Sequence, residues 1–129
     1  MKGKGLLTNT TSIIVTGNVP DVMELSEVGE EQRKKITSAL QSGQELMVWD
    51  ESHVIAGRTL AAILTAERYS DRLLGGNKMM SAVNRFTMIA LGNNVQVRGD
   101  MKRRVWPGRL VPDTAHPEHR DNFRNPDLD

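Results

Sequence analysis

The sequence predicts one α/β domain with a mostly parallel β-sheet and flanking helices. Three observations predict this class: the chain has 129 residues, its apolar runs are short, and segments of helical character separate those runs. The formal net charge of +1 gives no sign of a polybasic protein, and the absence of cysteine excludes disulfides and thiolate metal sites. Because the sequence has neither a signal-peptide pattern nor a long apolar run, we expect a cytoplasmic protein without a membrane partner.

Three short apolar runs are predicted as β-strands, at residues 12–15 (SIIV), 45–49 (ELMVW) and 86–91 (FTMIAL). The first is expected to end at residues 16–20, where a glycine and a proline interrupt regular structure. The second is too short for an independent helix and is bounded by polar residues, which favours a buried central strand. The third is followed by Gly-Asn-Asn, which is typical of a turn.

Two segments are predicted as helices, at residues 30–41 and 58–67. The first has two apolar residues four positions apart, acids in its first turn and a glycine shortly after its end. The second is rich in alanine and leucine, with apolar residues at helical spacing. From residue 111 onward, prolines and polar residues dominate, so we expect a core at residues 1–110 and an irregular tail at residues 111–129.

Two successive carboxylates, Asp50 and Glu51, follow the apolar run that is predicted as the central strand. In open α/β sheets, ligands bind at this end of the strands. In a P-loop ATPase the first carboxylate holds Mg²⁺ and the second orients or deprotonates the attacking water, so both residues are candidates for catalysis and Asp50 for metal binding. An ordinary buried strand that ends in a polar loop produces the same pattern.

An amide side chain is expected at the same edge of the sheet, from Asn93 or Asn94. Asparagine can position a hydrolytic water by hydrogen bonding without adding a charge that repels phosphate. Asparagine and glycine are also common turn residues, so the pattern by itself equally fits a plain turn.

Basic residues cluster at residues 98–104 (RGDMKRR), shortly after the last predicted strand. Arginine stabilises the charge on a phosphoryl group during transfer, often across a subunit boundary, which is one possible role for this cluster. A solvated basic surface or a contact with nucleic-acid phosphates explains the cluster as well. Near the N-terminus, Gly3 and Lys4 match the Gly-Lys pair of the phosphate-binding loop G-x-x-x-x-G-K-S/T.

Taken in order, these segments resemble the AAA+-like helicase domain of phage and plasmid replication proteins, which is often joined to a primase or a Toprim domain. The match covers nearly the whole chain and is most specific in SDRLLG followed by NRFTMIALGNNVQVRGDMKRRV; it also includes GKGLL, IIVTGNVPDVMEL, EEQRKKITSALQSGQELMVWDE and HPEHRDNFRNPDLD. The resemblance implies a P-loop NTPase-like fold with ATP and Mg²⁺ as cofactors. It also implies movement on DNA, with single-stranded DNA and either further copies or a complementary ATPase fragment as partners.

The resemblance also implies individual roles: phosphate binding by Gly3 and Lys4, metal binding by Asp50, catalysis by Asp50 and Glu51, water positioning by Asn93 or Asn94, and an arginine finger at Arg103 or Arg104. The chain departs from the family pattern at Gly5, which stands where the family has the hydroxyl residue that binds Mg²⁺. From the family pattern we expect a chain that is truncated at the phosphate loop and before the helical lid. We therefore expect the isolated chain to bind ATP poorly.

Another class of function fits the same sequence: a DNA-binding or protein-interaction module that keeps the fold and does not hydrolyse ATP. The incomplete phosphate loop favours this alternative, whereas the pair Asp50 and Glu51 favours retained chemistry. A gene fragment that folds poorly by itself is a third possibility. Trp49 and Trp106 are predicted to be packing residues, since aromatic residues are scarce and not interleaved with basic ones.

Overall fold

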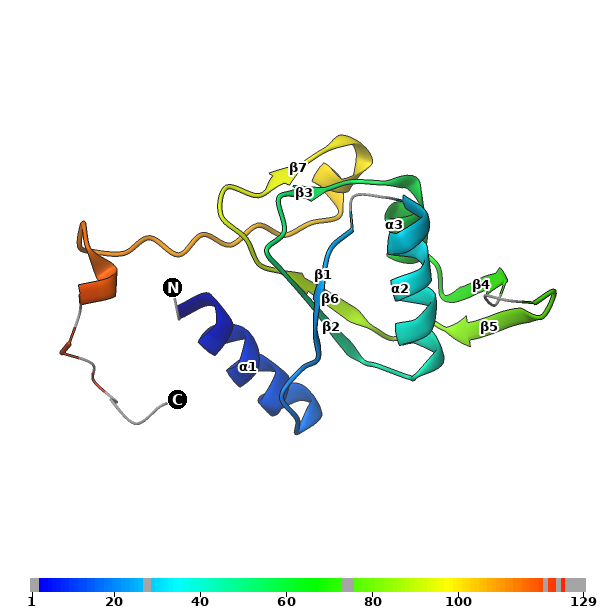
Figure 1. The fold of residues 1–129 in the computed structure, drawn as a ribbon, viewed down its shortest axis with the longest axis horizontal. Coiled ribbons are helices and arrows are strands. Elements are labelled where there is room, and N and C mark those ends of the chain that lie inside the picture. Colours follow the sequence, from blue (N-terminus) through cyan, green and yellow to red (C-terminus); the bar gives the residue numbers. More distant parts are fainter. Residues whose placement is uncertain (1–2, 27–28, 73–75, 120, 123, 125–129) are drawn as a thin grey trace.

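The structure, a computed structural model, describes residues 3–26, 29–72, 76–119, 121–122 and 124. These residues form an α/β structure with a small parallel sheet, which confirms the predicted class at that level. Figure 1 shows the arrangement of its elements. Their bounds are α1 Gly3–Thr16, β1 Val22–Glu24, α2 Gly29–Gln41, β2 Leu46–Asp50, β3 Val54–Ile55, α3 Arg58–Ile63, β4 Arg68–Arg72, β5 Met79–Val83, β6 Thr87–Ala90, β7 Gln96–Val97, and the 3₁₀ turns η1 Gly99–Arg103 and η2 Pro117–His119.

The central sheet has three parallel strands in the order β1-β2-β6. In the register of this sheet, Val22 lies opposite Val48, and Leu46 lies opposite Thr87. Two smaller pairs flank the sheet: β3 and β7 are parallel, and β4 and β5 form an antiparallel hairpin. The strands predicted at 45–49 and 86–91 are therefore confirmed, with each bound shifted by one residue.

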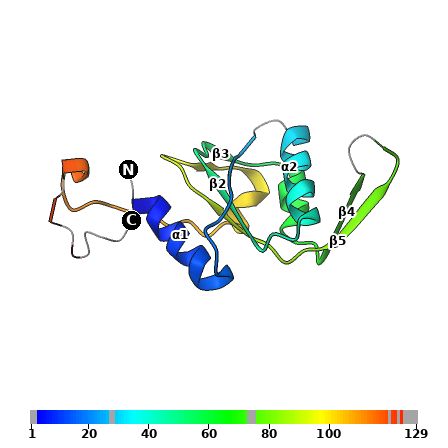
Figure 2. The ribbon, with the colours of Figure 1, turned by 60° about the horizontal axis from the view of Figure 1, so that its bottom comes forward.

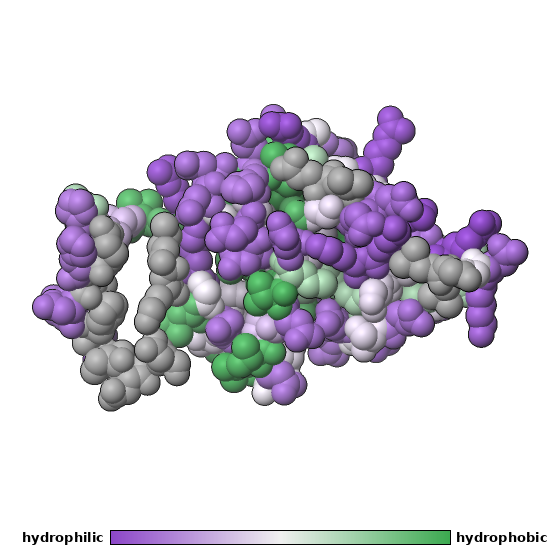
Figure 3. Space-filling view, viewed as in Figure 1, coloured by the Kyte–Doolittle hydropathy of each residue, from purple (hydrophilic) through white to green (hydrophobic). Residues whose placement is uncertain are grey.

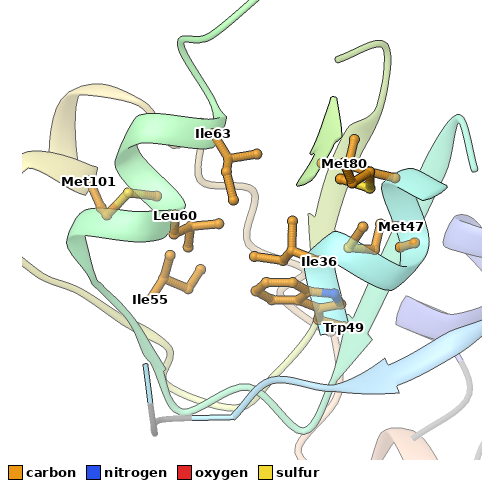
Figure 4. Close-up of a cluster of buried hydrophobic side chains, with 10 residues drawn as sticks. Ile36, Met47, Trp49, Ile55, Leu60, Ile63, Met80 and Met101 are labelled. Carbon is orange, nitrogen blue, oxygen red and sulfur yellow. The ribbon is translucent and has the colours of Figure 1, made fainter. Parts of the chain in front are cut away.

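Strand β2 lies between β1 and β6, and its residues 46–49 are buried, as expected for a strand that is covered on both faces. Helices α2 and α3 cover one face, where Met47 and Trp49 join a core with Ile36 of α2 and Leu60 of α3 (Figure 4). Helix α1 contacts β2 from the other side, so that α1 and α2 lie on opposite sides of the sheet (Figure 2). The result is a three-layer arrangement of helices, sheet and helix. Hydrophilic side chains dominate the face of the molecule seen in Figure 3.

The strand predicted at residues 12–15 is wrong, because these residues belong to helix α1. A short apolar run favours a strand, but polar groups fix the helix: Ser12 is 1% exposed and donates a hydrogen bond of 2.8 Å to the carbonyl of Asn18. Gly17, with φ 78°, ends the helix, and its N–H donates to the carbonyl of Ile13. The glycine that was expected to end a strand is therefore the C-terminal cap of a helix.

The predicted helix at 30–41 is confirmed, whereas the one at 58–67 is shorter and ends at Ile63. The side-chain amide of Asn84, just after β5, donates hydrogen bonds to the carbonyls of Ile63 and Ala66. These bonds satisfy carbonyl groups at the end of the helix and let the chain turn into β4. After η1, residues 105–116 contain neither helix nor strand.

Candidate functional site

The C-terminal ends of β1, β2 and β6 lie together, because the three strands run in the same direction. We call this region the carboxyl edge; it consists of the last residue of each strand and the loops at residues 25–26, 51–53 and 91–94. It is the edge at which open α/β sheets bind their ligands. Asp50 is the last residue of β2, and Asn93 follows β6.

The first turn of α1 brings Lys4 to the carboxyl edge. Its Nζ donates a hydrogen bond of 2.7 Å to the carbonyl of Gly92 and another of 2.7 Å to Oδ1 of Asn93. Gly3, the other residue of the predicted phosphate-binding pair, is the exposed first residue of the same helix. The structure therefore brings together Lys4 and Asn93, although 89 positions separate them in the sequence.

The loops after β2 and β6 are held against each other at Gly92. The N–H of Ser52 donates a hydrogen bond of 2.8 Å to the carbonyl of Leu91, and Ser52 is 1% exposed. A Cβ atom at Gly92 would lie 2.0 Å from the carbonyl oxygen of Ser52, so only glycine fits at this approach. This contact keeps Glu51, the neighbour of Ser52, at the same edge as Asn93.

The two candidate acids lie at the end of β2, and both are exposed. Oδ1 of Asp50 accepts a hydrogen bond of 2.8 Å from the N–H of Glu51. Glu51 has a φ of 50°, in the left-handed region that residues other than glycine seldom adopt. Such backbone conformations are concentrated at functional sites, where the surrounding structure maintains them.

A cavity of about 350 Å³ opens beside Glu51. Lys35 of α2 lines this cavity, and its Nζ donates a hydrogen bond of 2.8 Å to the carbonyl of Glu24. The cavity lies on the β1 side of Glu51, whereas Lys4 and Asn93 lie on the β6 side, so the hollow and the lysine–asparagine contact are different parts of the carboxyl edge. The cavity is lined by Glu24, Leu25, Ser26, Lys35, Glu51, His53 and Val54.

The remaining candidates lie outside this cluster of contacts. Asn94 has a φ of 54° and is exposed, as expected for a turn residue. Arg103 and Arg104 belong to η1 and the residue after it, and both pair with Asp100, the latter at 2.6 Å. Hydrogen bonds from the two arginines lower the pKa of the Asp100 carboxyl, and the same contact raises the pKa of Arg103. The structure therefore connects the arginines to their own turn and not to Lys4 or Asn93.

The residues at the carboxyl edge fit a magnesium nucleotide in part. Among the described residues, no three His, Asp or Glu side chains are placed to hold a metal ion together. Mg²⁺ at nucleotide sites needs only one or two carboxylates, because phosphate oxygens and water supply the other ligands. The exposed carboxylate of Asp50 meets that requirement and Lys4 provides a cation for phosphate, whereas Gly5 carries no hydroxyl.

Sequence reasoning missed two residues that shape the site. One is Ser52, whose burial at the contact of two loops has no signature in the sequence. The other is Lys35, for which the sequence predicts only a place in a helix, although its side chain contacts the end of β1. Its position one turn after the acids of α2 gives no indication of that contact.

Comparisons with protein-family models, with curated proteins and with solved structures found no match. None of the described helices has both the length and the apolar character needed to cross a membrane.

Proposed function

We propose that this chain is the nucleotide-binding part of a P-loop ATPase of the AAA+ kind, as used by phage and plasmid replication proteins to move along DNA. The observation that carries the proposal is the contact of Lys4 with Asn93 and Gly92 at the carboxyl edge. A cation at a helix N-terminus, an amide and two carboxylates on one sheet edge are the groups that a phosphoryl-transfer site requires.

Each residue has a role in this proposal. Lys4 neutralises phosphate oxygens, and Asp50 holds Mg²⁺ directly or through water. Glu51 orients or deprotonates the attacking water, and Asn93 positions that water by hydrogen bonding. A bound magnesium nucleotide supplies the phosphoryl group that is transferred. In this proposal Lys4 exchanges its bond to Asn93 for a phosphate oxygen, which frees the amide for the water.

The arginines act, in this proposal, on the nucleotide of a neighbouring copy, which makes self-assembly part of the mechanism. Arg103 is the better candidate, because 79% of its side chain is exposed against 27% for Arg104. To reach a neighbour it must exchange the carboxylate of Asp100 for a phosphate. An ion pair this exposed contributes little to stability, so breaking it for the exchange costs little free energy.

A module that keeps this fold and binds DNA or protein without hydrolysis is the alternative. The absence of a hydroxyl at Gly5 favours it, because that group normally contributes to Mg²⁺ binding in a phosphate loop. The two functions differ in whether the chain responds to ATP at all.

The test is ATP binding and hydrolysis by the purified chain with Mg²⁺, with and without single-stranded DNA. We expect Lys4→Ala to weaken ATP binding roughly 10- to 100-fold, since it removes a charge-assisted contact. We expect Glu51→Gln to retain binding and to lower hydrolysis about 100-fold or more, because the general base is lost.

Lys78→Ala, which removes an exposed lysine next to β5, is the matched control and should behave as the wild type. A folded chain that binds no ATP at millimolar concentration would exclude the ATPase and leave the alternative. Hydrolysis that Glu51→Gln does not change would remove Glu51 from the mechanism.

A further inference from the structure

Trp106 is the most exposed large apolar side chain that the structure describes, at 97%. The other tryptophan, Trp49, is 4% exposed and lies in the core (Figure 4). The prediction that both are packing residues is therefore confirmed for Trp49 and wrong for Trp106. An indole contributes to stability through the large apolar area that it buries. Because the indole of Trp106 buries almost none, it does not help to hold this fold together.

The position of Trp106 is fixed although its side chain is free. The preceding residue, Val105, is partly buried against the core, and its N–H donates a hydrogen bond of 3.1 Å to the carbonyl of Met101. Met101 is 2% exposed and anchors η1. The following residue, Pro107, restricts its own φ and the backbone of Trp106. Trp106 therefore lies at a defined place in the chain, directly after η1 and at the start of the segment without helix or strand.

Positive charge is concentrated in the segment of the sequence that contains Trp106. Residues 98–111 contain five of the 17 Lys and Arg residues of the chain and one of its 16 acids, for a net charge of +4. The chain as a whole carries +1, so the rest of it is net negative. Asp100 pairs with two arginines, whereas Lys102 and Arg109 are exposed and have no acidic partner among the described residues.

We propose that residues 102–109 bind single-stranded nucleic acid, with one base stacked on the indole of Trp106 and the adjacent phosphates held by Lys102 and Arg109. An exposed aromatic ring beside cations is the combination by which proteins bind unpaired strands, since any base offers a face for stacking. Base pairs in a duplex already stack on each other, so double-stranded DNA offers no free base face to the indole of Trp106. The choice of a polynucleotide rests on the proposed function, but the contact requires no ATP.

The presence of only two tryptophans makes the test direct. In Trp49→Phe, which removes the core indole, all tryptophan emission comes from Trp106. Addition of a 20-nucleotide oligo(dT) should quench this emission, and oligo(rU) distinguishes DNA from RNA. Loss of the Trp49 indole leaves no hydrogen-bond partner unsatisfied, because its Nε1 has no partner among the described residues.

Affinity is measured separately by the anisotropy of labelled oligo(dT) with chains that keep Trp49. We expect Trp106→Ala to weaken binding roughly 10-fold and Trp106→Phe to retain most of it, because phenylalanine still stacks. We expect Arg109→Ala to weaken binding and to reduce the slope of log affinity against log salt by about 0.7, the value for one phosphate contact on a single strand.

Lys4→Ala and Glu51→Gln should bind oligo(dT) like the wild type without ATP, so a failure of the proposed ATPase leaves this test intact. Unchanged affinity in Trp106→Ala, absence of quenching, or equal binding of duplex DNA would overturn the proposal. A chain that self-associates through Trp106, with dimers that Trp106→Ala dissociates and no quenching by oligonucleotide, would likewise overturn it in favour of a protein partner.

Discussion

At Gly92 the loops after β2 and β6 come closer than any side chain permits. A Cβ atom there would lie 2.0 Å from the Ser52 carbonyl oxygen and 2.6 Å from Cγ2 of Val95. Gly92→Ala must therefore separate the two loops, and we expect it to lower the free energy of unfolding by about 2 kcal/mol or more, as overpacking of a tight contact does. Urea denaturation, followed by the loss of helical circular dichroism, measures this change.

The control is Gly108→Ala, because a Cβ atom at Gly108 has no neighbour within 4 Å. It should change stability by less than about 0.5 kcal/mol. Equal stability of the two variants would mean that the loops at Gly92 are farther apart than the structure places them. If the loops at the carboxyl edge form the site, Gly92→Ala should also weaken ATP binding, whereas Gly108→Ala should not.

Some features of single residues can be predicted from the sequence, and others cannot. The spacing of Asp50 and Glu51 after an apolar run correctly predicts where these residues lie in the sheet, because strand ends follow from local pattern. The contact of Lys4 with Asn93 depends on how α1 crosses the sheet, and no local pattern specifies that crossing. The left-handed conformation of Glu51 is equally hidden, since glutamate has no preference for it.

At the level of whole elements, the buried strands and α2 were predictable because period and length agree with each other. Helix α1 was not, although Leu6 and Ile13, and likewise Leu7 and Ile14, are seven positions apart, which is a helical spacing. The usual rule that apolar faces point inward fails here: α1 buries Thr8 and leaves Ile14 78% exposed. A pattern can predict a helix without revealing which face contacts the sheet.

The hairpin of β4 and β5 is attached to α2 through Asp71. One carboxylate oxygen accepts hydrogen bonds of 3.0 Å from Thr37 and 3.2 Å from Tyr69, and Arg33 lies 3.5 Å away. Burial raises the pKa of Asp71, but the N–H of Arg72, the Thr37 hydroxyl and Arg33 together hold it below its ordinary value of 3.8. The folded state therefore favours the ionised carboxylate.

Since the folded pKa of Asp71 is lowered, its stabilisation is present above pH 3.8 and is lost as the pH falls through the folded value. We expect Asp71→Asn to lower the free energy of unfolding by about 1–3 kcal/mol at pH 7. The difference from the wild type should shrink as the pH falls below 3.8 in urea titrations. Asp113→Asn, in the segment without helix or strand, is the control; a difference for Asp71→Asn that does not depend on pH would exclude the ionic contribution.

Over the whole molecule, stability is distributed unevenly between the two faces of the sheet. Helix α2 buries five of its residues, with Ile36 fully buried, whereas α1 buries only Thr8 and Ser12. Little apolar area holds α1 in place, and its contact at the carboxyl edge depends on Lys4. Elements with few buried apolar contacts open at lower free energy than the core, so α1 should open without global unfolding.

Amide hydrogen exchange tests this distribution together with the proposed role of Lys4. We expect amides of α1 to exchange through a local opening, at lower free energy than those of α2 and β2, which should exchange by global unfolding. If ATP binds through Lys4, a concentration about 100 times the dissociation constant should raise the opening free energy of α1 by about 2.7 kcal/mol, and Lys4→Ala should abolish this increase. Equal opening free energies for α1 and β2 without nucleotide would show that α1 opens only by global unfolding. Protection of α1 by ATP in Lys4→Ala would place the nucleotide elsewhere on the chain.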